Sequence, residues 1–314
     1  MVTESQHRRA PNGFTGGQWE TFTRDGFLVL ENALDEDDIL RYTTGVDRVA
    51  SIHGRPTSHN ATSVDNLVQL DSDFAELIDH PRHVGFAYDL FGELLKLHRS
   101  RLILRPPESK LAQVWHLDGP RAVPYRTFSP ELPLQLQIGY WLTDMPNTEM
   151  GNLVVLPGSH RIDYLPQYDT NEHVPGEVSL CFPRGTITIM HASLWHRGHQ
   201  NRSDVTRKTI YISYCPAWLQ AADRLSCDDA WLNSLDRERR IIMRGYSHGY
   251  DYAKPPQDDF PLFLERDGSD RDAGVYDDRI RLHRRKRLTA AEKWTTSNRL
   301  QQTSEPQSEN ESPT

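Results

Sequence analysis

The stretch "RKTIYISYCP", residues 207–216, combines β-branched and aromatic residues with a two-residue alternation. On an extended chain, alternate side chains share a face. One face carries the polar side chains of Arg207, Thr209, Tyr211 and Ser213. The opposite face carries Ile210 and Ile212. This pattern predicts a strand whose apolar face packs against helices and whose polar face can line a pocket.

Similar short runs, separated by turns that contain Gly and Pro, begin at about residue 97. They are "LHRSRLILR" (97–105), "AQVWHLD" (112–118), "LQLQIGYWLTD" (134–144), "NLVVLPGSH" (152–160) and "TITIM" (186–190). Many short strands at such intervals are typical of a sandwich or a small barrel. We therefore predict an α+β protein built on an antiparallel double-stranded β-helix, a jelly-roll or cupin-like barrel over about 97–216, flanked by helices.

The sequence around this barrel carries helix signals. The segments that predict helices are 16–26, 35–54, 72–95 and 221–300, and a further strand is predicted at 27–32. Gly26 ends the first helix and Pro81 breaks the third. No internal repeat or linker divides the middle of the chain, so we expect a single domain over 1–298. The polar end, 299–314, has little to bury and predicts a disordered tail.

The composition bounds the class of protein. The chain has 314 residues, with 44 acidic and 36 basic side chains, and a net charge of −8. This charge argues against nucleic acid or an anionic membrane as a partner. Three cysteines are too few and too scattered for a disulfide framework, and no apolar run is long enough to span a membrane. We expect a cytoplasmic monomer or homodimer that acts on a small molecule.

The candidate chemistry begins at "VWHLDGP", residues 114–120, where His116 and Asp118 share one face of an extended segment. Such a pair can form a metal clamp, an acid–base pair or a buried hydrogen bond. A second stretch supplies His196, in a turn after the 186–190 strand, and Arg207 eleven residues later. Two imidazoles and a carboxylate form the facial triad of non-haem Fe(II) oxygenases, which leaves coordination positions open. A 2-oxo acid and O₂ can fill them, with a cation such as Arg207 on the far carboxylate.

Four stretches together resemble the phytanoyl-CoA dioxygenase family of Fe(II)/2-oxoglutarate oxygenases. They are "FTRDGFLVLENALDEDDI", "WHLD", "GNLVVLPGSHR" and "LWHRGHQNRSDVTRK", which together span roughly 20–215. The last stretch has the family's spacing from the second histidine to the arginine, with Asn201 and Ser203 between them. The resemblance implies that His116, Asp118 and His196 bind iron and that Arg207 binds the 5-carboxylate of 2-oxoglutarate.

The resemblance also suggests secondary contacts and marks two departures. Arg105, in "ILRPPES", stands where some members hold a basic residue near the 2-oxo acid. Tyr140 stands where relatives place a pocket aromatic next to the cosubstrate, and packing in the core is an equal alternative. Gly198 replaces the serine that many members have two residues after the second histidine, which removes one expected cosubstrate hydrogen bond. Thr186 replaces an aspartate that often follows the glycine before its strand.

Several further residues are weighed for the site. Trp115 and Trp195 each precede a predicted ligand and are candidates to buttress it and to border the substrate pocket. Arg121, just beyond the metal strand, is a candidate substrate contact. The neighbouring histidines His191, His199 and His160 are not predicted to be ligands, because only His196 has the arginine at the family spacing.

We expect a dioxygenase that oxidises a small or medium polar metabolite of a biosynthetic pathway, by hydroxylation or by desaturation or ring closure. Its cofactors would be Fe(II), 2-oxoglutarate and O₂, with release of succinate and CO₂. A halogenase would need a small residue in place of Asp118. The alternative from another class is a non-catalytic metal-binding barrel with a sensing or structural role. The loops 121–133 and 164–179 are candidate lids.

Overall fold

The computed structural model describes residues 11–57, 60–108, 112–118, 133–221, 228–243 and 262–263. A large sheet has seven strands in the order β1-β8-β5-β10-β4-β3-β2. Their bounds are β1 Phe27–Leu30, β2 Arg55–Pro56, β3 Thr62–Asp65, β4 Leu95–Arg105, β5 Leu136–Trp141, β8 Thr186–His191 and β10 Arg207–Pro216. A small sheet has the order β7-β6-β9, with β6 Leu153–Val155, β7 Val178–Ser179 and β9 His196–Gly198. The paired strands of both sheets are antiparallel.

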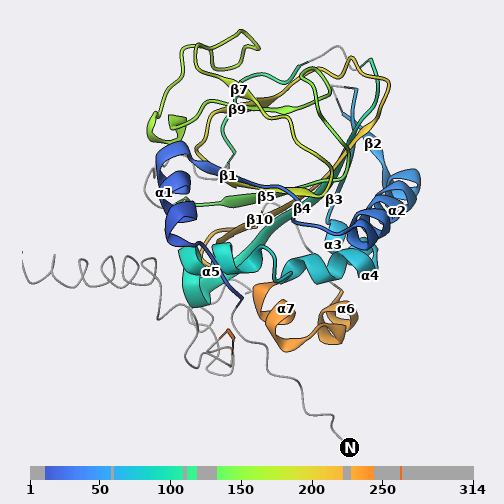
Figure 1. Ribbon diagram of the computed structural model, residues 1–314. Helices are drawn as coiled ribbons and strands as arrows, with labels where there is room; N and C mark the ends of the chain where they lie inside the picture. The colour runs from blue at the N-terminus through green and yellow to red at the C-terminus, as the bar shows by residue number, and fades with distance from the viewer. Residues whose placement is uncertain are drawn as a thin grey trace, which may run out of the picture. The chain divides into compact units, whose positions relative to one another are not determined.

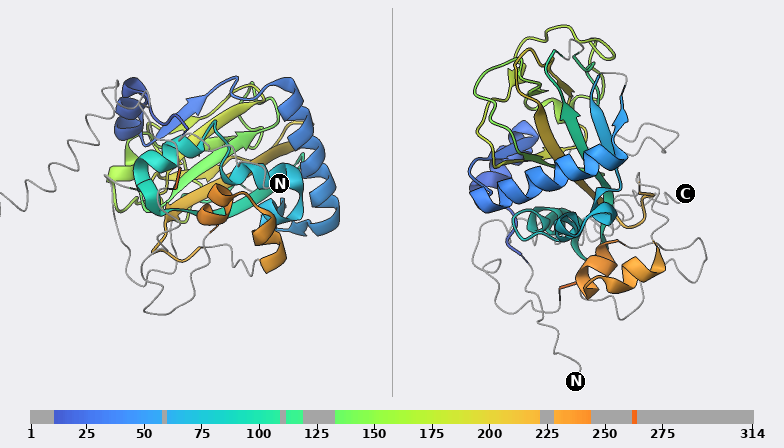
Figure 2. Two further views of the ribbon diagram at one scale, coloured as in Figure 1. Left: turned by 90° about the horizontal axis from the view of Figure 1, so that it is seen from below. Right: turned by 90° about the vertical axis from the view of Figure 1, so that its right-hand side faces the viewer.

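Helices cover one face of the large sheet, and the small sheet faces the other (Figures 1 and 2). The α-helices are α1 Gly16–Asp25, α2 Glu36–His53, α3 Leu67–Leu70, α4 Ser72–Ala75, α5 Val84–Phe91, α6 Asp229–Ser234 and α7 Arg237–Ile242. Three short 3-10 helices are η1 Glu76–Ile78, η2 Gly92–Leu94 and η3 Ser159–Arg161. This arrangement of layers confirms the predicted α+β barrel.

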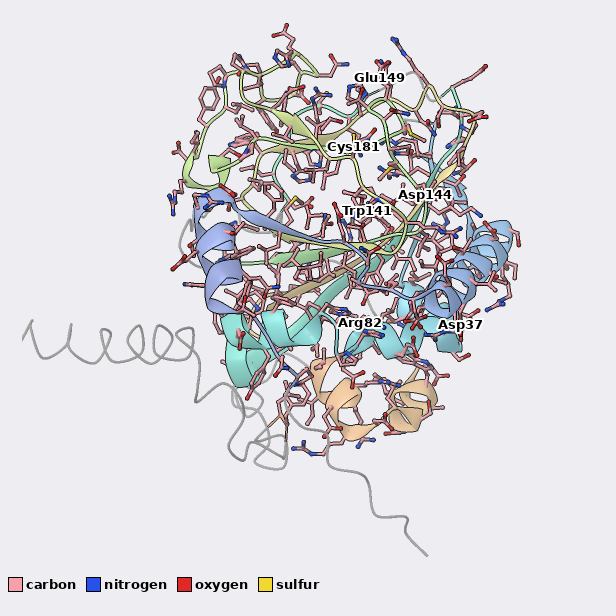
Figure 3. All side chains as sticks on the ribbon, viewed as in Figure 1. Asp37, Arg82, Trp141, Asp144, Glu149 and Cys181 are labelled. Carbon is pink, nitrogen blue, oxygen red and sulfur yellow. The ribbon has the colours of Figure 1, made fainter. Side chains whose placement is uncertain are left out.

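The register of the central strands decides which side chains enter the barrel. On β10, Thr209 lies beside Trp141 of β5, and Ile210 lies beside Tyr140. Trp141 points between the two sheets (Figure 3) and packs with residues of both, including Val155 and Met190. Because side chains alternate along a strand, the polar face of β10 is turned inward and its isoleucines face the helices, as the sequence predicts.

Some local predictions need correction. His196 was expected in a turn, but it begins β9, because its backbone pairs with β6 and with His116. The predicted strand 112–118 is reduced to isolated bridges at Trp115 and His116. Strands β2, β3 and β7 were not predicted, since two of them have only two residues.

The C-terminal predictions are tested only in small part. Helices α6 and α7 fall in the expected helical segment, and most of 221–300 and the whole predicted tail lie outside the described residues. The single-domain boundary at 298 stays a prediction. Within the described residues, none of the helices is both long and apolar enough to cross a bilayer.

The junction between α1 and β1 depends on one glycine. The Thr15 side chain caps the start of α1, and Gly26 ends the helix in the left-handed region, with φ of 84°. A Cβ at Gly26 would lie 2.6 Å from Nδ1 of His160. This position therefore requires glycine for both its backbone conformation and its close contact.

Gly26→Ala is expected to lower the free energy of unfolding by about 1–3 kcal/mol, because alanine strains the left-handed backbone and meets His160. Gly17→Ala is the matched control: Gly17 lies in the first turn of α1, and a Cβ added there would have nothing within 4 Å. It should raise stability by about 0.5–1 kcal/mol through the better helix propensity of alanine. Urea unfolding of both variants measures these opposite signs, and equal effects would contradict the account of the junction.

Candidate metal centre

Two backbone segments bring the predicted ligands together. His116 and His196 form an antiparallel bridge in which each backbone N–H donates to the other's carbonyl, at 3.0 and 3.2 Å. Their rings lie 4.3 Å apart, between centroids. The Asp118 side chain reaches the same point, with Oδ2 3.6 Å from Nε2 of His196. One ligand atom from each residue lies within 4.8 Å of the others, so the three can hold one metal ion.

Backbone carbonyls fix the orientation of both imidazoles. Nδ1 of His116 lies 2.7 Å from the carbonyl oxygen of Val114, and Nδ1 of His196 lies 2.9 Å from that of Leu194. A carbonyl only accepts hydrogen bonds, so each Nδ1 carries the proton. Each Nε2 then presents its lone pair to the centre. Such support by neighbouring hydrogen bonds is characteristic of metal-ligating histidines.

The triad opens into a pocket between the sheets. The described residues that line it are Arg99, Arg101, Ile103, Gln113, His116, Asp118, Gln137, Leu153, His196, Gly198, Arg207 and Tyr211. They come from β4, β5, β6, β9, β10 and the segment 112–118. The two sheets thus share one polar cavity that contains the triad and the predicted cosubstrate arginine.

Arg207 is a buried cation at one end of this pocket. Its side chain lies over the Trp141 ring at 5.3 Å, and Nη1 donates to the Gly151 carbonyl oxygen at 2.5 Å. Nε of Arg207 is buried and has no hydrogen-bond partner within the described residues. Burial lowers the pKa of this guanidinium. A buried charge with an unused donor fits a bound anion, which would restore the lost solvation.

Arg105 lies beside Arg207 on β4, as its direct strand partner. Its Nη1 donates to the His199 carbonyl oxygen at 2.7 Å. Burial, and then the charge of Arg207, lower the pKa of Arg105 to about 9. The two neighbouring guanidinium groups make this end of the barrel strongly positive, which an anionic cosubstrate would offset.

The departure at Gly198 has a structural counterpart. A Cβ there would lie 2.6 Å from Oε1 of Gln113 and 3.0 Å from Nη2 of Arg105. The backbone N–H of Gln113 donates to the Gly198 carbonyl at 2.8 Å, which holds the two residues together. The amide of Gln113 and the guanidinium of Arg105 thus approach the backbone where a serine side chain would stand.

The turn before β10 is built by two residues of the matching motif. Asn201 Nδ2 donates to the carbonyls of Arg105, at 3.0 Å, and Val205, at 2.8 Å. Ser203 Oγ donates to Oδ1 of Asn201 at 2.7 Å. These bonds tie the turn to the end of β4 and so set the start of β10, from which Arg207 enters the pocket.

Three residues named for the pocket lie elsewhere. For Tyr140 the structure agrees with the alternative of core packing, because it lies on the face of β5 opposite to Gln137 and turns toward the helices. There its hydroxyl lies 2.5 Å from Nδ1 of His83. Trp115 and Trp195 do not border the pocket: they are fully buried in an apolar cluster with Val154, Leu165 and Val174. Both indoles therefore support the neighbouring ligands from behind, as the buttressing interpretation states.

The remaining candidates lie away from the triad or outside the described residues. His191 accepts from the Ser193 backbone N–H, and its ring lies 5.1 Å from that of His160. Neither these two nor His199 belongs to the group of possible metal ligands found among the described residues. Thr186 Oγ1 donates to the Pro183 carbonyl. Arg121 lies outside the described part of the chain.

Four polar lining residues were missed at the level of sequence: Arg99, Arg101, Gln113 and Gln137. A signal existed for the two arginines, because they alternate with Arg105 along one strand and so share its face. Gln137 and Gln113 carry no comparable signal, since an amide on a short strand is ordinary.

Residues 22–209, more than half of the chain, match the family model described as phytanoyl-CoA dioxygenase. The chain belongs to this family. An ectoine dioxygenase from Nocardia farcinica is 29% identical over 157 residues, which cover 46% of this chain and 50% of the relative. The chain thus spans about half the length of the ectoine dioxygenases that it matches.

Solved structures with the same fold support the family's barrel for this chain. The non-heme alpha ketoglutarate dependent carbocyclase SnoK from nogalamycin biosynthesis superposes with a TM-score of 0.55 at 20% identity. The match covers 70% of this chain and 95% of SnoK. HygX from Streptomyces hygroscopicus, with nickel and 2-oxoglutarate bound, superposes with a TM-score of 0.58 at 15% identity. The match covers 69% of this chain and 93% of HygX. These likenesses confirm the predicted double-stranded β-helix.

Single replacement of His116, Asp118 or His196 by Ala is expected to reduce Fe(II) affinity strongly while leaving a folded protein, because each supplies one of three converging ligand atoms. His199→Ala is the matched control, since it removes a nearby imidazole that is outside the triad. Anaerobic equilibrium dialysis of Fe(II), with circular dichroism as the folding check, measures the difference. Normal Fe(II) binding by His196→Ala together with its loss in His199→Ala would refute the ligand assignment.

Proposed function

We propose that this protein is an Fe(II)- and 2-oxoglutarate-dependent dioxygenase. The observation that carries the proposal is the convergence of His116, Asp118 and His196 in a pocket that also holds the buried cation Arg207. Two imidazoles and one carboxylate form the arrangement used by non-haem Fe(II) oxygenases. Membership of the phytanoyl-CoA dioxygenase family supports the same activity.

The described residues of the pocket fit both Fe(II) and 2-oxoglutarate. The ligand atoms of the triad converge, and both imidazoles are held in the tautomer that a metal requires. Arg207 offers a buried Nε donor and a planar guanidinium, which matches a carboxylate in two-point geometry. When bound, Fe(II) with 2-oxoglutarate supplies the activation of O₂ that oxidises an unactivated C–H bond, with release of succinate and CO₂.

The chain's own residues bind, orient and shield these groups. His116, Asp118 and His196 would hold the iron from one side and leave its other side open to the pocket. Arg207 would hold the far carboxylate of 2-oxoglutarate, with Arg105 adding positive charge behind it. Trp115 and Trp195 exclude water behind the two histidines, since both are fully buried in the apolar cluster. The apolar backing keeps the ligands rigid and the centre sheltered.

We infer hydroxylation of a small or medium polar metabolite, with desaturation or oxidative ring closure as alternatives that begin with the same hydrogen abstraction. The relative named ectoine dioxygenase and the neighbour named as a carbocyclase support this range. We further propose that the protein acts in the cytoplasm, belongs to a biosynthetic pathway and is a monomer or a homodimer. A halogenase is disfavoured because Asp118 occupies the position that a halide would need.

The test of the activity is an aerobic screen of candidate metabolites with Fe(II), 2-oxoglutarate and ascorbate, with the His196→Ala variant as the inactive control. The expected result is substrate-stimulated succinate formation and a product that gains one oxygen atom, or loses two hydrogen atoms if the outcome is desaturation or ring closure. Anaerobic addition of Fe(II) and 2-oxoglutarate should give the weak visible charge-transfer band of a chelated 2-oxo acid. Absence of both the band and succinate would favour the non-catalytic barrel.

Arg207→Lys is expected to weaken 2-oxoglutarate binding, because lysine keeps the charge but loses the planar fork. The loss should be about 2–5 kcal/mol, or roughly 30-fold to several thousand-fold in affinity. Arg239→Lys is the matched control: Arg239 pairs with Asp79 at 2.7 Å and is not among the pocket residues. Anaerobic titration of the charge-transfer band with 2-oxoglutarate gives both affinities. An unchanged affinity in Arg207→Ala would transfer the role to Arg105.

A further inference from the structure

The inward face of β4 carries a row of side chains along the whole pocket. Arg105 lies at one end of this row, opposite Arg207, and Arg101 and Arg99 lie opposite Tyr211 and Ser213 of β10. Arg105 lies six positions after Arg99, which corresponds to roughly 20 Å along a strand. The barrel therefore has two separate arginine pairs, and 2-oxoglutarate at the Arg207 end would lie away from Arg99 and Arg101.

The second pair is part of the cavity that holds the triad. Arg99 and Arg101 line the same pocket as His116, Asp118 and His196. Their side chains are 34% and 29% exposed, so a molecule that enters from solvent can reach them. A ligand held here would lie beside the metal centre without occupying the Arg207 end.

The charges at this end favour an anion. Among the described residues that line the pocket, Asp118 is the one acidic side chain, and its carboxylate belongs to the triad. The basic lining residues are Arg99, Arg101 and Arg207. A positive wall beside a concave site attracts and orients negatively charged ligands.

Asp65 holds these arginines in position from the neighbouring strand β3. It is the strand partner of Arg101, and Nε of Arg101 donates to Oδ1 of Asp65 at 2.7 Å. Nε of Arg99 lies 3.8 Å from the same oxygen. Because Asp65 itself is 47% exposed, its charge is well screened and offsets the two guanidinium groups only in part.

A neutral hydrogen-bonding group completes this end of the pocket. Gln137 lines the cavity from β5, and Ser213 Oγ donates to its Oε1 at 3.3 Å. Ser213 is the strand partner of both Gln137 and Arg99. The Gln137 amide on β5 and the two guanidinium groups on β4 thus flank Ser213 of β10, and together they are suited to a planar carboxylate or a phosphate.

We propose that Arg99 and Arg101 bind an anionic group of the substrate, a carboxylate or a phosphate, and so hold its oxidisable carbon near the triad. The inference rests on the proposed function, because the bound anion is a substrate only if the protein is an oxygenase. It makes Arg99 and Arg101 specificity-determining residues, and it restricts the substrate class to small molecules that carry at least one negative charge.

The test is ligand-observed NMR on the full chain with Zn(II) in place of Fe(II) and with saturating 2-oxoglutarate to fill the Arg207 end. The probes are matched pairs of an acid and its neutral counterpart, including N-acetyl-L-proline with N-acetyl-L-prolinamide and glycerol 3-phosphate with glycerol. Carboxylate and phosphate probes separate the two kinds of anion. At least one acid is expected to bind about tenfold or more tightly than its neutral partner, the difference made by a charge-assisted contact.

Three variants separate this role from a structural ion pair. Arg99→Gln with Arg101→Gln should weaken acid binding about tenfold to a hundredfold and leave neutral probes unchanged. Asp65→Asn should strengthen acid binding by up to about fivefold, because it removes a competing carboxylate. Arg48→Gln with Arg184→Gln, which removes the same charge from exposed ion pairs outside the pocket, should change neither.

The outcomes also separate this proposal from the proposed activity. Arg207→Ala should retain acid binding at the second pair, which excludes the cosubstrate end as its source. The proposal is overturned if acids and neutral probes bind equally, if no acid binds the wild type, or if the double variant keeps wild-type acid affinity. Loss of the charge-transfer band and of succinate in the wild type, with acid binding still dependent on Arg99 and Arg101, would instead refute the oxygenase activity alone.

Discussion

The pairing of β10 with β4 on one side and with β5 on the other is the constraint on which the site depends. This register places Arg207 opposite Arg105, and Tyr211 opposite Arg101 and Gly139. A slip of one residue would turn every side chain of β10 to the other face. Arg207 would then meet the helices in place of the pocket, and Ile210 would enter the barrel. The Asn201 turn at the start of β10 therefore matters as much to the site as the arginine itself.

The same alternation creates a second polar layer behind the sheet, and this layer explains the position of Tyr140. Tyr140 and Tyr214 point toward the helices, where His83 lies 2.5 Å from both hydroxyl groups. Tyr214 also donates to the backbone carbonyl of Ile78 at 3.0 Å. Burial lowers the pKa of His83 well below its ordinary value, so its imidazole stays neutral and can bridge the two phenols. The aromatic pattern at Tyr140 thus reflects the attachment of the helices, and not the pocket.

Much of the fold was predictable because its strands alternate clearly and its helices carry distinct ends. Thr15 and Gly26 define α1, and Pro81 falls where the helical segment is interrupted. The two-residue strands are too short to show an alternating pattern in the sequence. Strand β9 was not predicted, because it has only three residues. The backbone bridge between His116 and His196 joins residues that are far apart in sequence, so no local pattern can show it.

The residues of the site differ in the same way in whether the sequence predicts them. The ligand triad follows from motif spacing, whereas the second arginine pair depends on which strands lie next to one another. Arg99 and Arg101 share the face of Arg105. Their place in the pocket depends on the sheet, in which β10 lies between β4 and β5. The net charge of −8 argues against nucleic acid or an anionic membrane as a partner, yet the described lining of the pocket is mainly basic among its charged residues. Net charge describes the solvent-facing average, while a ligand responds to the few groups within about a Debye length of it, roughly 8–10 Å. A globally acidic protein can therefore hold a strongly positive cavity, and the sign of that cavity, not of the whole chain, selects its substrate.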